Sequence, residues 1–306
     1  MELRRDRALG SPLRENRTAG SARGDEPKGN QGPVPTHQSI DRTMLMEMLQ
    51  ARVADGKLLR LVGKCLHVGV LEGAEISEPD TGTVQGSVLS PLLGNVYLHH
   101  VLDVWFEREV KPRMRGKTTL ARYADDFVIG FEREDDAKRV MEVLGRRFER
   151  FGLKLHPEKT RLLPFHRPRS GNDGGKGPAT FDFLGFTLHW RRTRAGRWMP
   201  AFKTRKARLR HAIQAADDWC RRHRHESVKE QYATLKRKLV GHYNYFGVNG
   251  NLRSLALLLD NVQWNWHAWL SRRSQRGHLN WARFLELLRR FPLPAPRIRV
   301  QIWSAP

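Results

Sequence analysis

Cysteines, acidic side chains and long apolar runs are all scarce in this chain of 306 residues. The two cysteines, Cys65 and Cys220, lie far apart and lack the Cys/His spacing of a zinc site, so we expect two reduced thiols. No segment approaches the roughly 18 consecutive apolar residues that a membrane span requires. The N-terminus carries charges where a secretory signal would carry apolar residues. The sequence therefore predicts a cytoplasmic protein without a membrane partner.

Basic residues are abundant where acidic ones are scarce. Lysine and arginine together number 55 against 32 aspartates and glutamates, and the formal net charge is +23. A surface with this excess repels itself unless a polyanion is bound, so nucleic acid is the expected partner. The excess is concentrated from Thr187 to the C-terminus, where 25 basic residues stand against 6 acidic ones. Eight of the nine tryptophans lie in the same part, so we expect a basic, aromatic-rich second domain.

The N-terminal part of the chain changes character near residue 40. Residues 1–38 are rich in Arg, Gly, Pro, Ser and Asn and have almost no apolar periodicity, so a disordered leader is expected. A helix begins near Asp41, a suitable cap, and its apolar stripe consists of Met44, Leu45, Met48 and Leu49. A second helix is expected over residues 58–70, followed by a turn over residues 75–80.

The middle and C-terminal parts differ in the elements that they are expected to form. Ser90 followed by Pro91 predicts a helix start, with the hydroxyl as cap, and a helix to about residue 108. Two apolar runs from Thr119 to Phe131 predict a β-hairpin with two acids at its turn. The elements expected beyond it are a helix over 135–150 that Gly152 ends, strands over 153–155, 161–165 and 181–190, and three or four helices over 203–290. The expected fold class is α+β, with an all-α second half.

The strongest chemical signal is the tetrapeptide Tyr123-Ala124-Asp125-Asp126. Adjacent carboxylates flanked by apolar strands repel each other, and burial penalises both ionised forms. A divalent cation removes that penalty, and Mg²⁺ prefers carboxylate and phosphate oxygens, as in two-metal phosphoryl-transfer sites. The alternative interpretation is an ordinary solvated turn between two strands. The neighbouring motifs favour the metal site.

Four motifs resemble, in order and spacing, those of reverse transcriptases of the bacterial group II intron type. The tetrapeptide Tyr123–Asp126 matches the catalytic hairpin of that family. Gly82-Thr-Val-Gln-Gly-Ser is similar to the box before it, with two mild departures. Gly152-Leu-Lys-Leu-His-Pro-Glu-Lys-Thr160 and Phe183-Leu-Gly-Phe186 resemble the two boxes that follow. The resemblance extends over residues 40–300 and identifies the chain as a member of this family.

The resemblance implies a fold and a chemistry. Residues 39–188 would form a partial polymerase palm, an antiparallel sheet packed by helices, and residues 189–306 an all-α thumb and maturase domain. Asp125 and Asp126 would be the catalytic residues and the ligands of Mg²⁺ in template-directed DNA synthesis on RNA. The residues that would contact the incoming nucleotide or the primer are Tyr123, Ala124, Gln85, Gly86, Lys159, Leu184 and Gly185.

The residues themselves leave structural alternatives open for these neighbouring motifs. Gln85-Gly86 can simply be a tight loop that leads into a helix. Alternatively, the absence of a side chain at Gly86 lets the backbone approach a nucleotide closely. Lys159 can be a surface residue of a Pro-Glu-Lys-Thr turn. Phe183–Phe186 is most simply core packing at a strand turn, which is compatible with support of the primer end.

The C-terminal part carries the candidate RNA-binding residues. Gly241-His-Tyr-Asn-Tyr-Phe-Gly247 resembles the thumb and maturase region known as domain X. Tyr243 and Tyr245 could stack on RNA bases, although aromatic residues beside glycine in a helical domain more often belong to the core. A basic cluster spaced at i, i+3 and i, i+4 presents two cationic faces for phosphates, or else a solvated helix face. Its members are Lys203, Arg205, Lys206, Arg208 and Arg210.

One element of the family pattern is missing from the sequence. In the family a third metal-binding aspartate lies in a strand ahead of an Ile-Asp-His segment, which Ile40-Asp41-Arg42 resembles. The corresponding position here is Gly32, in a segment that is neither acidic nor strand-like, and the fingers region is absent as well. We therefore interpret the chain as an N-terminally truncated member with an unrelated leader. Because two metals about 4 Å apart need carboxylates from more than one strand, little or no polymerase activity is expected.

Three functions follow from these motifs. The first is a group II intron reverse transcriptase/maturase, an RNA-directed DNA polymerase by family, whose partners would be intron RNA, an RNA template, a DNA primer and deoxynucleotides. The second is a polymerase-inactive RNA-binding splicing cofactor, and the third a degenerate remnant. A second copy of the chain, as a homodimer, or a separately encoded N-terminal fragment would be its protein partner.

Overall fold

The computed structural model of the protein describes residues 41–66, 70–72, 75–77, 89–168, 179–193, 195–274 and 278–302, with backbone alone for 70–72 and 75–77. The leader predicted for residues 1–38 lies outside the described residues, as do the predicted nucleotide-binding residues Gln85 and Gly86. The described chain is a mixture of helices and small antiparallel sheets, which agrees with the expected α+β class.

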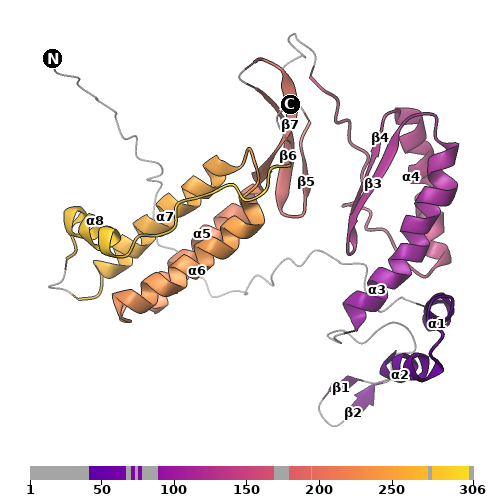
Figure 1. Ribbon diagram of the computed structural model, residues 1–306, viewed down its shortest axis with the longest axis horizontal. Helices are drawn as coiled ribbons and strands as arrows, with labels where there is room; N and C mark the ends of the chain where they lie inside the picture. Colours follow the sequence, from indigo (N-terminus) through magenta and orange to yellow (C-terminus); the bar gives the residue numbers. More distant parts are fainter. Residues whose placement is uncertain are drawn as a thin grey trace, which may run out of the picture.

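The first half consists of helices and two antiparallel hairpins, drawn from indigo to magenta in Figure 1. Its helices are α1 (Arg42–Gln50), α2 (Gly56–Leu66), α3 (Ser90–Leu98) and α4 (Glu134–Arg150). The helix α3 continues without a break into two π-helical segments and a 3₁₀ turn, which span His99–Val104, Phe106–Val110 and Lys111–Arg113. The two hairpins pair β1 (Val70–Glu72) with β2 (Glu75–Ser77), and β3 (Thr118–Tyr123) with β4 (Asp126–Phe131).

The second half joins a three-stranded sheet to four helices, drawn from pink to yellow in Figure 1. The sheet is antiparallel in the order β5 (Phe181–Phe183), β6 (Phe186–Arg192) and β7 (Trp198–Thr204). The helices are α5 (Lys206–Arg222), α6 (Val228–Phe246), α7 (Leu252–Leu270) and α8 (Trp281–Arg290). The boundary expected at residues 188/189 falls inside β6, so the sheet is not divided there.

The first hydrophobic core lies between α1, α3, α4 and the β3–β4 hairpin. As predicted, Asp41 caps α1, because its carboxylate accepts the backbone N–H of Met44 at 3.0 Å, and Leu45 of the apolar stripe is fully buried. Gly152, at φ +68°, ends α4 as expected, and the N–H of Leu153 bonds the carbonyl of Phe148 at 2.9 Å.

A buried carboxylate joins α4 to the loop that leads into β3. Asp136 lies in the first turn of α4, where a negative charge suits the helix dipole, and its side chain is fully buried. Its Oδ2 atom accepts the backbone N–H groups of Arg115 and Gly116, each at 2.9 Å. These bonds fix the point at which the β3–β4 hairpin enters the fold.

The second core lies among the four C-terminal helices and contains a polar network. Trp266 is fully buried and donates its indole N–H to the side-chain oxygen of Gln231 at 2.8 Å. The amide nitrogen of Gln231 in turn donates to the carbonyls of His223 and Glu226, which belong to the loop between α5 and α6. The network satisfies buried polar groups that would otherwise be costly.

Asn251 joins the sheet to the helices. Its side chain is buried and accepts the backbone N–H of Thr204 at 2.8 Å, at the end of β7. It also donates to the hydroxyl of Thr204 and to the carbonyl of Phe246, each at 2.8 Å. The end of β7 is therefore tied to the turn between α6 and α7.

Several expected elements differ from those observed. The strands predicted over 153–155 and 161–165 are wrong, because these residues form no ladder with any described strand. The strand predicted over 181–190 is divided by a turn at Leu184-Gly185. Strand β7 was not among the expected elements; it contains Pro200, and it is an edge strand of the described sheet, where proline is tolerated.

Helix starts also differ from the expected ones. Asp55 accepts the backbone N–H of Lys57 at 2.8 Å, so α2 begins at Gly56 and ends at Leu66, short of residue 70. Ser90 is the first residue of α3 and not its cap, because Leu89 holds the cap position without a side-chain bond. Three or four helices were expected over 203–290, and the structure has the four helices α5 to α8 there.

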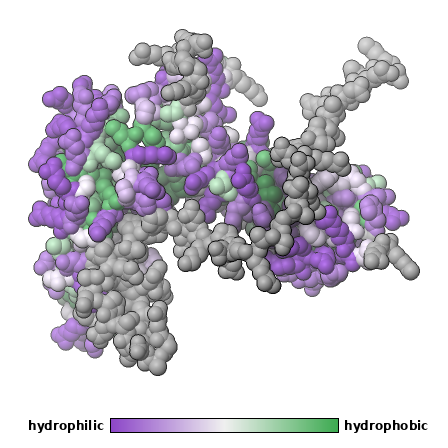
Figure 2. All heavy atoms as spheres, turned by 180° about the vertical axis from the view of Figure 1, so that it is seen from behind, coloured by the Kyte–Doolittle hydropathy of each residue, from purple (hydrophilic) through white to green (hydrophobic). Residues whose placement is uncertain are grey.

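The surface of the second half is mostly hydrophilic in the view of Figure 2, whereas apolar residues gather on the first half. Among the described residues, no helix has both the length and the apolar character needed to cross a membrane.

Candidate active site

The two aspartates lie at the tip of the β3–β4 hairpin. Tyr123 pairs with Asp126, which leaves Ala124 and Asp125 as a two-residue turn. Ala124 has a φ of +50°, a left-handed conformation that costs a non-glycine residue about 1 kcal/mol or more. The surrounding contacts must therefore hold this turn in place.

The carboxylates are accessible to a ligand. Asp125 is partly exposed, Asp126 is exposed, and the Tyr123 ring beside them is 69% exposed. Carboxylate oxygens are the donors that Mg²⁺ prefers, so the pair fits a hard divalent cation. Within the described part of the chain, no group of three or more His, Cys, Asp or Glu side chains could hold a metal ion. Any third acidic ligand must come from outside that part.

Arg122 connects this turn to the α3 helix and its π-helical extension. Its Nε and Nη2 atoms donate to the two carboxylate oxygens of Asp103, each at 2.7 Å. Its Nη1 atom donates to the side-chain oxygen of Asn95 at 2.8 Å and to the carbonyl of Ala124 at 3.0 Å. The Arg122 side chain is only 13% exposed. Charge-assisted, bidentate bonds of this kind are among the strongest in proteins.

Asp103 is held in its charged form by these contacts. Burial by itself would raise the pKa of Asp103, but the hydrogen bonds and charge of Arg122, together with His99, hold this pKa below its usual value. The Nδ1 atom of His99 lies 3.2 Å from Oδ2 of Asp103. The Asp103 carboxylate is therefore ionised at neutral pH.

The other residues expected around the nucleotide are located as follows. Lys159 is exposed in the turn after His156, and its ammonium makes no ion pair with a described residue. The described contacts therefore do not bring Lys159 to the aspartates.

The turn at Leu184-Gly185 lies against the end of α6. Leu184 and Gly185 have φ values of +48° and +78°. The hydroxyl of Tyr245 donates to the carbonyl of Leu184 at 2.9 Å, and its ring stacks on Phe186 with centroids 5.8 Å apart. Glycine suits position 185 because its φ of +78° is left-handed and would strain a residue with a side chain.

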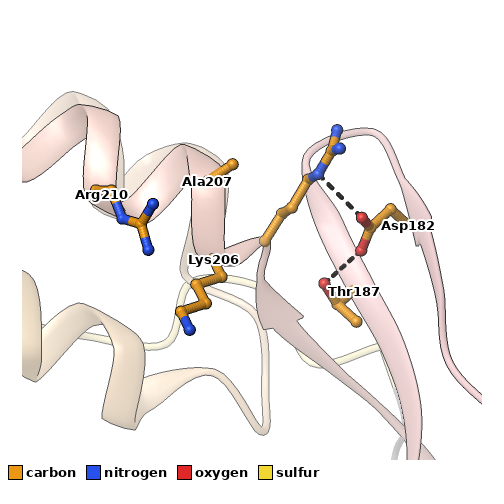
Figure 3. A pocket seen from close by; sticks show the side chains of 6 residues that line it. Asp182, Thr187, Lys206, Ala207 and Arg210 are labelled. Carbon is orange, nitrogen blue, oxygen red and sulfur yellow. Dashed lines mark hydrogen bonds and ion pairs between the residues drawn. The ribbon is translucent and has the colours of Figure 1, made fainter.

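Basic side chains line an open pocket at the start of α5 (Figure 3). Asp182 pairs with Nε of Arg205 at 2.9 Å and accepts the hydroxyl of Thr187 at 2.5 Å. Lys206 and Arg210, one helical turn apart, line the same pocket without an ion pair to a described residue. Lys203 and Arg208 are also exposed, so the whole basic cluster faces solvent.

The two tyrosines have different environments. Tyr243 is 2% exposed and belongs to the second core, the alternative that the sequence left open. Burial raises its pKa to about 12. Tyr245 is 55% exposed, although its hydroxyl is engaged by Leu184. Only Tyr245 is therefore available to a nucleic acid.

Sequence reasoning missed Arg122, Asp103 and Asn95. Arg122 directly precedes the acidic turn, and an arginine within a short apolar strand is a signal, since a buried charge needs a partner. The partners lie 19 and 27 residues earlier in a helix of mixed composition, where no local pattern distinguishes them.

Comparison with known proteins identifies the first half. Residues 37–188 match the family described as reverse transcriptase (RNA-dependent DNA polymerase), so this segment is a reverse transcriptase domain. The chain is homologous to the group II intron-encoded protein LtrA of Lactococcus lactis subsp. cremoris, with 30% identity over 139 residues. That match covers 42% of this chain and 23% of LtrA.

Two further relatives come from a yeast and a bacterium. The uncharacterized 91 kDa protein in cob intron of Schizosaccharomyces pombe is 27% identical over 135 residues, 42% of this chain and 17% of that protein. Protein YkfC of Escherichia coli K12 is 27% identical over 186 residues, 52% of this chain and 45% of YkfC. The chain thus spans less than half the length of these curated relatives.

Proposed function

We propose that the chain acts as a group II intron reverse transcriptase/maturase, which copies RNA into DNA and binds intron RNA for splicing. The observation that carries this proposal is the exposed Asp125-Asp126 pair at a strained hairpin tip, inside the segment that belongs to the reverse transcriptase family. Adjacent acids at such a turn are expected where a cation and a polyphosphate are bound.

In the proposed reaction, the 3′-hydroxyl of a DNA primer loses its proton and attacks the α-phosphate of a deoxynucleoside triphosphate, and the bond to the β-phosphate breaks so that pyrophosphate leaves. Asp125 and Asp126 would hold Mg²⁺, which when bound neutralises charge on the reacting phosphate. Gln85 and Gly86 would contact the nucleotide, and Lys159 its triphosphate. Leu184 and Gly185, fixed by Tyr245, would support the primer end. The neighbouring Tyr123 and Ala124 would contact the nucleotide or primer beside the acids.

The second half would bind RNA through its basic cluster. Lys203, Lys206, Arg208 and Arg210 are exposed and make no ion pair with a described acid, so their charges remain available for phosphates. Arg205 forms an ion pair with Asp182, so its charge is not wholly available to phosphates. Tyr245 adds an exposed aromatic ring beside this surface. Tyr243 is left out of the proposed surface because it is buried.

A polymerase-inactive splicing cofactor is the second candidate function. It is favoured by the sequence, which has Gly32 where the family has its third aspartate, and among the described residues no group of three acidic or other side chains could hold a metal ion. The basic second half does not depend on the metal site. The degenerate remnant is disfavoured, since both halves have a formed core with satisfied buried polar groups such as Gln231 and Asn251.

Primer extension on an RNA template tests the proposal directly. Without a third acidic ligand little incorporation is expected from the chain; incorporation of deoxynucleotides with Mg²⁺ that falls on the order of a thousandfold in an Asp125→Asn/Asp126→Asn variant would establish the polymerase function. Exposed Asp135 to Asn, on α4, is the matched control and should leave the rate unchanged. Absence of incorporation by the wild type, with salt-sensitive RNA binding retained, would establish the cofactor function instead.

A further inference from the structure

We propose that Arg122 is a positioning residue for the Asp125-Asp126 turn, and that Asp103 and Asn95 hold Arg122 in its working orientation. The proposal rests on the proposed polymerase function for its kinetic consequence. Its structural consequence, the fixed conformation of the turn, can be tested independently.

Four of the five N–H donors of the Arg122 guanidinium are bonded within the protein. Nε and Nη2 bond Asp103, while Nη1 bonds Asn95 and the carbonyl of Ala124. These bonds leave no pair of N–H groups for bidentate binding of a phosphate, and the side chain is only 13% exposed. Arg122 therefore acts on the turn and not on a substrate.

The bond to Ala124 acts at the strained residue of the turn. Ala124 has φ +50°, and a strained non-glycine conformation persists only where surrounding contacts determine it. The Nη1 bond reaches the Ala124 carbonyl, which belongs to the peptide group that enters Asp125. Fixing this carbonyl fixes the direction in which the Asp125 side chain leaves the hairpin.

The helix that supports Arg122 is shaped for this contact. Asp103 lies in the π-helical segment His99–Val104, and short π segments are frequent at functional sites. Asn95 lies eight residues earlier in α3, yet both side chains reach the same guanidinium. Asn95 is itself oriented, because its amide nitrogen donates to the carbonyl of Pro91 at 3.0 Å.

Lysine is the most informative substitution at this position. Arg122→Lys keeps the charge and one contact with Asp103, but a single ammonium cannot reach Asp103, Asn95 and Ala124 with the geometry of the planar fork. A residue that only stabilises the fold would tolerate lysine. A residue that positions the turn would not.

The experiment compares full-length Arg122→Lys, Arg122→Ala and Asp103→Asn with Arg146→Ala, an exposed arginine of α4. Hydrogen exchange of the backbone amides in residues 123–127 should be faster by at least about tenfold in the first three variants and unchanged in the control. Melting temperature and exchange elsewhere should stay near wild type for Arg122→Lys. In primer extension, kcat should fall on the order of tenfold to a hundredfold, with the KM for nucleotide within about twofold.

Two results would overturn the proposal. One is wild-type turn exchange and kcat in Arg122→Lys, which would make the residue merely structural. The other is a loss of kcat that accompanies a general loss of protection throughout the first half. If the wild type has no polymerase activity, the catalytic part of the proposed function fails, and the exchange data alone decide whether Arg122 positions the turn. If Arg122→Ala does not fold, Arg122→Lys and Asp103→Asn carry the test.

Discussion

The two halves of the molecule use charged residues in opposite ways. In the first half, several charges are buried or partly buried and paired, as in Arg122 with Asp103 beside the acidic turn and Asp136 with two backbone N–H groups at the base of the hairpin. In the second half, most of the basic cluster on β7 and α5 is exposed and makes no ion pair with a described acid. The first arrangement gives fixed geometry, and the second leaves charge available for a flexible polyanion. The difference fits a chemical site in one half and a binding surface in the other.

The largest expected effect concerns the buried network of the second half. Gln231→Ala removes the acceptor of Trp266 and the donor to the α5–α6 loop, so the free energy of unfolding should fall by about 3 kcal/mol. Tryptophan fluorescence during chemical denaturation reports this half, which holds eight of the nine tryptophans. Lys229→Ala, exposed on the same helix, is the control. An unchanged midpoint in Gln231→Ala would show that the network contributes nothing to this half.

A smaller effect is expected in the binding surface. Lys206→Ala/Arg210→Ala should weaken binding of structured RNA and reduce the slope of affinity against salt by about 2, one unit for each lost phosphate contact. Arg289→Ala/Arg290→Ala on α8 removes the same charge at another exposed site. Equal losses in both double variants, measured by filter binding across salt, would mean that the RNA responds to net charge alone.

Two glycines should respond to alanine in opposite directions. Gly185→Ala should lower the free energy of unfolding by about 1 kcal/mol, because the φ of +78° is strained for alanine. Gly145→Ala lies within α4 with open space around the new methyl group, and should raise it by about 1 kcal/mol. Thermal melts of the two variants, compared with wild type, give the sign of the change in the free energy of unfolding. A stabilising Gly185→Ala would contradict the left-handed turn at Leu184-Gly185.

The smallest effect is a dependence of stability on pH. Burial lowers the pKa of His242 below its usual value of 6.5, so the unfolded chain binds a proton that the folded chain does not. Stability is therefore complete above pH 6.5 and decreases as the pH falls toward the folded pKa. His242→Leu should flatten part of this slope in denaturation series from pH 7.5 to about 5. The slope would persist in part, since burial also lowers the pKa of His100 and of His189. A slope identical to wild type would exclude His242 as its source.

The sequence predicts the local elements of this protein better than their partners. The caps, apolar stripes and turn residues around Asp41, Tyr123–Asp126 and Gly152 are short-range signals, and the elements they predict are observed. The strands predicted over 153–155 and 161–165 failed because apolar residues such as Leu153 are buried in the core without a strand beside them. Strand β7 contains a proline, which is tolerated in a strand at the edge of a sheet. Whether a strand lies at the edge depends on the whole sheet, so the local sequence does not reveal it.

The candidate site follows the same rule. The acidic pair is recognisable from four consecutive residues. The contacts that orient it depend on Asp103 and Asn95, which lie 19 and 27 residues before Arg122. Gln85, Gly86 and the segment before residue 41 lie outside the described residues, so their part in the site stays a prediction. Tyr243 shows the limit of motif transfer, because a residue inside a recognised motif can serve the core alone.

The hydrogen bonds between β7, α6 and the Leu184-Gly185 turn couple the movement of these elements. Asn251 fastens the end of β7 to the α6–α7 corner, and Tyr245 fastens α6 to the Leu184 carbonyl. The β5–β6 tip is thus attached to α6 both directly and through its own sheet. A tilt of α6 must therefore move that tip as well, so under the proposed function a movement of the helices on bound nucleic acid would be transmitted to the place where the primer would end.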